Sequence, residues 1–199
     1  RGRDYLDRMQ AASQRMRNFI YDLLEYSKVA SKPRTLMPVD LKKVVDEVLV
    51  DLETLIKQTG GRVNIANLPI IEADELLMRQ LFQNLIGNAL KFHKPNASPI
   101  INLHSRYTSK GFWEITVEDN GIGFDMKYHD RIFKPFQRLH GRSQYEGSGM
   151  GLAICQKIVT IHCGTFSAKS EPQVGTRFMV LLPEAQEMKK TDFPAHIDS

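Results

Sequence analysis

Three short groups of residues in this 199-residue chain could do chemistry, and the first follows a predicted strand, Phe112–Val117. A carboxylate, Asp119, comes just after this strand and is followed by Asn120 and two glycines, Gly121 and Gly123. A buried carboxylate at a strand end can accept a hydrogen bond from an exocyclic amine such as that of adenine, and glycines let backbone approach a ligand closely. The Asn-Gly pair is also typical of an ordinary tight turn.

The second group lies on a helix predicted from Glu75 to about His93. Asn84, Asn88 and Lys91 are spaced four and three residues apart, so they share one face of that helix. Amide oxygens can ligate Mg²⁺, a hard cation that prefers oxygen, and a lysine can contact phosphate. The alternative is a solvated helix face without a ligand.

The third group, Gly147–Leu152, has alternating glycines and opens another predicted helix. Free N–H groups at a helix start favour anions. A polar loop precedes these glycines, whereas a Rossmann turn follows a strand, and the Gly-Lys-Ser/Thr of a P-loop is missing. The sequence therefore indicates a phosphate-facing helix start of another kind, or a mobile hinge.

The elements that must position these groups alternate between helices and strands. Asp40 and Asp74 are predicted N-caps, and the order is helix, strand, helix, strand, strand, helix, strand, strand. The predicted ranges are helix 40–58, strand 63–68, helix 75–93, strands 100–107 and 112–117, a short helical piece 126–133, helix 149–162, and strands 164–169 and 176–182. We predict an α+β fold, a two-layer α/β sandwich in which helices cover one face of a mixed sheet.

One long helix is predicted before this domain, from Arg3 to Ala30, because apolar or small residues recur there at helical spacing. The resulting apolar face is wide, which favours a helical bundle with another chain or with a helix outside this segment; packing on the following domain is the alternative. We assign 1–31 to this helix, 32–39 to a linker, 40–183 to the main domain and 184–199 to a flexible tail.

Composition narrows the class of protein. A net charge of +4 without a basic, aromatic-rich run argues against nucleic acid. The two cysteines have no metal-ligand spacing and suit a reducing compartment. No apolar run reaches transmembrane length and no signal peptide opens the chain. We expect a cytoplasmic segment of a longer protein, without membrane contact of its own.

The three groups occur in this order with Ile132–Arg138 between the last two. Together they resemble the ATP-binding catalytic domain of sensor histidine kinases of two-component systems, within the wider group of gyrase, Hsp90 and MutL. The resemblance covers residues from about 38 to 183 and is greatest to kinases linked to phytochrome or PAS sensors. The leading helix resembles the second helix of the dimerisation and histidine-phosphotransfer hairpin.

The resemblance implies a role for each group. Asn84 and Asn88 would hold Mg²⁺, Lys91 and Arg138 would contact phosphates, and Asp119 would accept from the adenine amino group. Thr176 would assist through a water, and Phe92 takes the place of the usual Tyr beside the nucleotide. The other implied roles are the adenine pocket (Gly121, Gly123), the lid anchors (Phe133, Phe136), the lid hinge and phosphate-facing turn (Gly147, Ser148, Gly149, Met150, Gly151), and apolar walls that could equally be core (Ile122, Ile132, Leu152, Phe178).

The phosphoacceptor departs from the family pattern. None of the six histidines has the family's acceptor context, so the acceptor is expected outside this segment, on a helix of the same kinase family in a homodimeric parent. Hydrolytic relatives need a Glu one helical turn before the metal-binding Asn, and Asn84 stands there. An amide cannot take a proton from water, which favours phosphoryl transfer to histidine, and then to a response regulator receiver domain. The alternatives are a non-catalytic nucleotide-binding signalling module and an ATPase of the gyrase and Hsp90 group.

Overall fold

The computed structural model describes residues 2–31, 35–108, 111–139 and 148–185. One layer is a five-stranded sheet in the order β2-β4-β5-β7-β6. The strands are β2 (Arg62–Ile65), β4 (Ile100–Tyr107), β5 (Phe112–Asp119), β6 (Thr165–Glu171) and β7 (Gly175–Pro183). Strand β2 runs parallel to β4, and the other pairs are antiparallel, so the sheet is mixed, as predicted.

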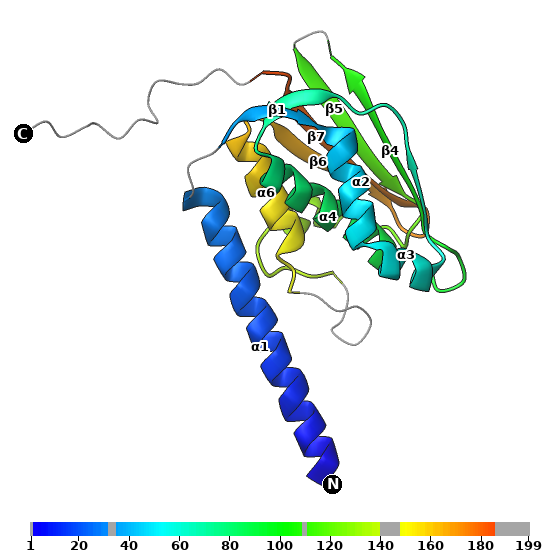
Figure 1. The fold of residues 1–199 in the computed structure, drawn as a ribbon. Coiled ribbons are helices and arrows are strands. Elements are labelled where there is room, and N and C mark those ends of the chain that lie inside the picture. Colours follow the sequence, from blue (N-terminus) through cyan, green and yellow to red (C-terminus); the bar gives the residue numbers. More distant parts are fainter. Residues whose placement is uncertain (1, 32–34, 109–110, 140–147, 186–199) are drawn as a thin grey trace, which may run out of the picture.

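The second layer consists of helices on one face of that sheet (Figure 1). These are α2 (Leu41–Asp51), α4 (Glu75–Lys91) and α6 (Gly151–Ile161). Alternating strand residues such as Ile115 and Val117 point into the core, where they meet buried residues of α4 such as Leu85. The predicted two-layer α/β sandwich is confirmed.

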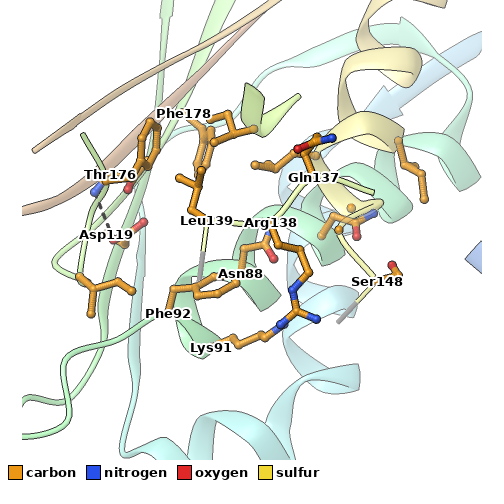
Figure 2. Close-up of a pocket in the computed structure, with 18 of the residues that line it drawn as sticks. Asn88, Lys91, Phe92, Asp119, Gln137, Arg138, Leu139, Ser148, Thr176 and Phe178 are labelled. Carbon is orange, nitrogen blue, oxygen red and sulfur yellow. Dashed lines mark hydrogen bonds between the residues drawn. The ribbon is translucent and has the colours of Figure 1, made fainter. Parts of the chain in front are cut away.

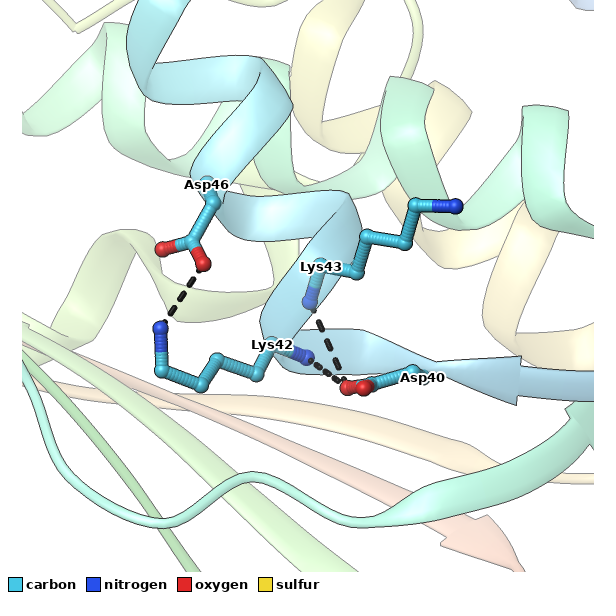
Figure 3. Close-up of polar contacts among 4 residues, drawn as sticks. All are labelled: Asp40, Lys42, Lys43 and Asp46. Carbon is cyan, nitrogen blue, oxygen red and sulfur yellow. Dashed lines mark hydrogen bonds and ion pairs between the residues drawn. The ribbon is translucent and has the colours of Figure 1, made fainter.

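The predicted N-caps hold the helices where the sequence places them. Asp40 Oδ1 accepts from the backbone N–H groups of Lys42 at 2.9 Å and Lys43 at 3.3 Å (Figure 3). Asp74 Oδ1 accepts from the N–H of Leu77 at 3.2 Å at the start of α4. Each cap satisfies backbone donors that the first helical turn leaves without partners.

The predicted helix 40–58 is wrong in its continuity, because it divides into α2 and α3 (Glu53–Thr59) at Leu52. Leu52 has φ −91° and ψ 3°. Its N–H still donates to the Val48 carbonyl, and its own carbonyl accepts from Ile56 N–H. The helical hydrogen bonds and the apolar spacing therefore continue across the break, so the spacing carries no signal of it.

The sequence analysis missed a two-stranded antiparallel sheet made of β1 (Met37–Asp40) and β3 (Ile70–Ala73). Residues 37–39, the last three of the expected linker 32–39, thus belong to strand β1. Pro38 suggested a linker, but a strand with a partner on one side only tolerates proline. Glu184, the first residue of the expected tail, is also held: its N–H donates to the Gly111 carbonyl and its carbonyl accepts from Glu72 N–H. Residues 186–199 of that tail lie outside the described residues.

Three further elements flank the sandwich. Helix α1 (Gly2–Ser31) forms as predicted, and η1 (Met126–Tyr128) with α5 (His129–Ile132) make the short helical piece after β5. Near its end α1 meets the domain, where Val29 is buried and Lys157 of α6 lies over the Tyr26 ring. Its N-terminal half extends away from the sandwich (Figure 1). Among the described helices, none combines the length and the apolar character that a membrane crossing requires.

A candidate nucleotide-binding site

A cleft of about 300 Å³ lies between α4, α6 and the ends of β5 and β7. It brings together residues from all three groups that the sequence singled out. The predicted site residues that line it are Asn84, Asn88, Lys91, Phe92, Asp119, Ile122, Gly123, Ile132, Arg138, Ser148, Gly149, Gly151, Leu152, Thr176 and Phe178.

Asp119 stands at one end of the cleft (Figure 2). Strand β5 runs two residues beyond its predicted end, so this carboxylate is the last residue of the strand. Its Oδ1 accepts from the N–H groups of Gly121 at 2.8 Å and Thr176 at 3.2 Å. No hydrogen bond from the described residues reaches Oδ2, which is therefore available to a ligand. Burial raises the pKa of Asp119 to about 6, although the two N–H donors oppose this rise.

The glycines after Asp119 fit their backbone positions closely. Gly123 has φ +59°, and a Cβ there would collide with the Glu171 carbonyl. A Cβ on Gly121 would collide with the Phe92 carbonyl. Gly121 does not line the cleft, so its part is to bring an N–H to Asp119.

The two amides of α4 lie across from the start of α6. Asn84 Nδ2 donates to the Gln80 carbonyl at 2.9 Å, and this bond turns Oδ1 the other way, toward Gly151. A Cβ on Gly151 would lie 2.9 Å from Asn84 Oδ1 and 3.8 Å from Asn88 Nδ2. The glycine therefore keeps open a polar space beside an amide oxygen, a ligand type that suits a hard cation.

Positive charge gathers at the end of the cleft away from Asp119. The side chains of Lys91 and Arg138 approach each other there, one from α4 and one from the segment after α5 (Figure 2). Lys91 Nζ also lies over the Phe92 ring, 4.8 Å from its centre. Two cations near a helix start form a site for an anion.

Sequence reasoning missed several residues that line the cleft: Asp22, Phe124, Gln137, Leu139 and Ile154. Leu139 points into the middle of the cleft, between Phe92 and Phe178 (Figure 2). It is an apolar residue in a polar loop, which is a signal that could have found it. Asp22 comes from α1, and no local pattern connects that helix with the cleft.

Four predicted site residues lie outside the cleft lining. Gly121 supports Asp119, and Met150 is buried in the core. The Phe133 ring packs edge-on against Phe166 at 5.1 Å. Phe136 instead stacks on Phe19 of α1, with 4.8 Å between ring centres, so it connects the cleft segment with the leading helix. Gly147, another predicted site residue, falls outside the described residues.

Comparison with known proteins decides the family. Residues 73–186 match the family described as histidine kinase-, DNA gyrase B-, and HSP90-like ATPase. The chain belongs to this ATPase family. That range contains the whole of α4, β5 and α6, the elements that build the cleft. The domain is of the histidine kinase ATP-binding catalytic type.

Two curated relatives show which members of this ATPase family the chain is similar to. The chain is 38% identical over 181 residues to the phytochrome-like protein Cph1 of Synechocystis sp. The aligned region covers 91% of this chain and 24% of the relative. It is 40% identical over 168 residues to cyanobacterial phytochrome A of Nostoc sp., covering 84% of this chain and 22% of the relative. The chain thus spans about a quarter of the length of these curated relatives.

A solved structure of full-length ShkA in complex with AMPPNP has a TM-score of 0.75 and 25% identity to this chain. It covers 93% of this chain, which spans 39% of ShkA. This similarity extends over α1 as well as the sandwich. The expected resemblance to phytochrome-linked and other sensor histidine kinases is confirmed.

Proposed function

We propose that this chain binds ATP with Mg²⁺ and transfers the γ-phosphoryl group to a histidine outside this segment. The observation that carries the proposal is Asn84, one helical turn before Asn88, with its amide nitrogen bonded to the Gln80 carbonyl. An amide cannot take a proton from water, so general-base help worth about 10²–10⁴ in rate is missing at that position. ATP held there stays intact until a better nucleophile arrives, and a neutral imidazole is one.

The ends of the cleft suit the two ends of ATP. Asp119 Oδ2 would accept from the adenine amino group, with Thr176 assisting and Phe92 beside the base. Lys91 and Arg138 would contact the phosphates, together with N–H groups at the start of α6. ShkA was solved in complex with AMPPNP, which supports ATP as the ligand in this proposal.

The amide pair fits Mg²⁺. Asn84 Oδ1 and the Asn88 side chain would supply one or two ligands, and Mg²⁺ usually takes its remaining ligands from phosphates and water. The described residues contain no group of three His, Cys, Asp or Glu side chains that could hold a metal, so amides are the candidates here. When bound, the ion would neutralise charge between phosphates during transfer.

The acceptor would reach the phosphate end of the cleft from the side of α1. None of the four described histidines lines the cleft. Helix α1, in contrast, places Asp22 on the cleft lining and Phe19 against Phe136. A hairpin partner packed on α1 would therefore lie close to Arg138. The chain's part in the reaction would be to position ATP and stabilise charge in an in-line transfer.

The relay partners follow from this chemistry. The phosphoryl group would pass from the histidine to an aspartate of a response regulator receiver domain, and the parent would be a homodimer through α1. We propose a cytoplasmic site of action, where ATP and receiver domains meet. Relatives whose names are sensor protein and sensor histidine kinase support these partners in general terms.

A specific observation favours hydrolysis as the second candidate. Asp22 is a carboxylate on the cleft lining, and a carboxylate can activate water. It comes from α1 rather than from α4, so its distance from the phosphates depends on how α1 sits. A non-catalytic nucleotide-binding module is the third candidate. It would require that the chain keeps all the polar residues of the cleft and yet does not turn over ATP.

One experiment separates these functions. The chain is incubated with γ-labelled ATP and Mg²⁺, with and without a histidine-bearing hairpin from a related kinase, and both released phosphate and labelled hairpin are measured. A kinase labels the hairpin and releases little phosphate. Steady release that Asp22→Asn abolishes would establish the ATPase instead. Binding without either product would leave the signalling module.

A further inference from the structure

Ser170 in β6 lies next to the cleft without lining it, and its hydroxyl makes three close polar contacts. Its Oγ lies 2.9 Å from the N–H nitrogen of Phe124 and 2.9 Å from the carbonyl oxygen of Gly175. It also lies 2.9 Å from Oγ1 of Thr176, where either hydroxyl could be the donor. Of these partners, Thr176 alone is a side chain that also lines the cleft.

Counting hydrogens assigns the direction of each bond. A serine hydroxyl has one hydrogen to donate and two lone pairs to accept with. The Phe124 N–H can only donate, so it occupies one lone pair, and the Gly175 carbonyl can only accept, so it takes the Ser170 hydrogen. The second lone pair of Ser170 then accepts from Thr176. The hydroxyl hydrogen of Thr176 is thereby directed away from the cleft.

This assignment makes the Asp119 end of the cleft a wall of acceptors. Thr176 Oγ1 presents only lone pairs to the cleft, and the Asp119 carboxylate beside it has no hydrogen to donate. The two residues are tied together, because the Thr176 N–H donates to Asp119 Oδ1 at 3.2 Å. A purine with a 6-amino group offers donors to this wall, whereas a 6-oxo purine faces it with another acceptor.

We infer that Ser170 is a positioning residue for base specificity: by taking the hydroxyl hydrogen of Thr176, it makes the cleft prefer 6-amino over 6-oxo purine nucleotides. The inference rests on the proposed nucleotide site. Removing the Ser170 hydroxyl frees the Thr176 hydroxyl to turn and donate to a 6-oxo group.

The test compares ATP with ITP binding to the full chain by calorimetry. Both ligands carry the same triphosphate, so their affinity ratio cancels the phosphate contacts. We expect Ser170→Ala to reduce the ATP-over-ITP ratio by about fivefold or more. Ser167→Ala, an exposed serine on the same strand, is the matched control and should keep the wild-type ratio.

A double variant separates a relay, meaning an effect of Ser170 that passes through the Thr176 hydroxyl, from a general disturbance of the site. Thr176→Val removes the hydroxyl on which Ser170 acts, so adding Ser170→Ala to it should leave the ratio unchanged. If Ser170→Ala does not fold, Ser170→Cys serves in its place, because a thiol is a weak hydrogen-bond acceptor of similar shape. An unchanged ratio in the folded Ser170 variant, or an equal drop in the Thr176→Val background, would overturn the relay. A wild-type chain that binds neither nucleotide would overturn the nucleotide site itself, and the relay with it.

Discussion

At the scale of single residues, the ionisation of Asp119 makes nucleotide binding depend on pH. Burial raises its pKa from 3.8 to about 6, so in the free protein the carboxyl is mostly ionised at pH 7 and mostly protonated at pH 5. A bound 6-amino purine favours the ionised form, which accepts from the amine. We expect adenosine affinity to fall by about tenfold between pH 7 and pH 5, one pH unit below that pKa.

Adenosine is the better probe for this pH dependence, because its lack of phosphates removes their own titration from the measurement. Calorimetric titrations at intervals from pH 5 to pH 8 would give the profile. Asp119→Asn, whose amide does not titrate in this range, should bind no adenosine at any of these pH values. Adenosine affinity that stays constant down to pH 5 would show that Asp119 does not face the base.

The same residue predicts a stability change of a known sign. Because the folded pKa lies above 3.8, the stability that Asp119 contributes is fully present below about pH 3.8 and is lost as pH rises through about 6. Asp119→Asn can still accept from Gly121 and Thr176 but carries no charge. We expect it to raise the free energy of unfolding at pH 7 by roughly 1–3 kcal/mol while abolishing adenosine binding. Urea denaturation at pH 7 measures the first effect; a variant less stable than wild type would contradict it.

At the scale of elements, the spacing between α4 and α6 depends on Gly151. An added Cβ would press on Asn84 Oδ1 at 2.9 Å, the oxygen proposed for Mg²⁺. We expect Gly151→Ala to weaken ATP binding in the presence of Mg²⁺ by about tenfold, the loss of one charge-assisted contact, and to leave adenosine binding nearly unchanged. Calorimetry with both ligands, with and without Mg²⁺, tests this. Equal losses for ATP and adenosine would indicate general damage to the cleft.

Gly87 offers a matched control on the same pair of helices. It lies inside α4, and nothing stands within 4 Å of an added Cβ. Alanine there reduces the freedom of the unfolded chain without a collision in the fold. We expect Gly87→Ala to stabilise the protein by about 0.5–1 kcal/mol and to keep ATP affinity. Thermal unfolding of both glycine variants in one buffer makes the comparison; a destabilised Gly87→Ala would mean that α4 needs flexibility there.

These elements also show how far the sequence could predict the fold and the site. Asp40 and Asp74 are local signals, since a cap depends on the next three residues, and both were predicted correctly. The pairing of β1 with β3 depends on contact between segments about thirty residues apart, with Pro38 giving the opposite signal. Asp22 reaches the cleft only through tertiary packing, and the bonds of Ser170 depend on its side-chain position in the folded protein.

At the scale of the whole molecule, α1 leaves much of its apolar surface uncovered by the described part of the chain. Toward its C-terminal end Val29 is buried, and Phe19 stacks on Phe136. Farther toward the N-terminus, Met9 is 70% exposed and Met16 66% exposed, and Tyr5, Leu6 and Ile20 are exposed as well. A contiguous run of large apolar side chains on a helix is a surface for association with another helix.

We therefore expect the chain to self-associate through the N-terminal half of α1, with Met9→Lys and Met16→Lys together shifting it to monomer. Each lysine puts a charge where a partner helix would have to bury it, at a cost of several kcal/mol. Sedimentation across a range of protein concentrations measures the association. Leu76→Lys is the control: Leu76 is equally apolar and 76% exposed, but it lies on α4, so the substitution should not change the assembly. Adenosine affinity should stay the same in all three proteins, because these positions do not line the cleft. A wild-type chain that is monomeric at every concentration would contradict this expectation.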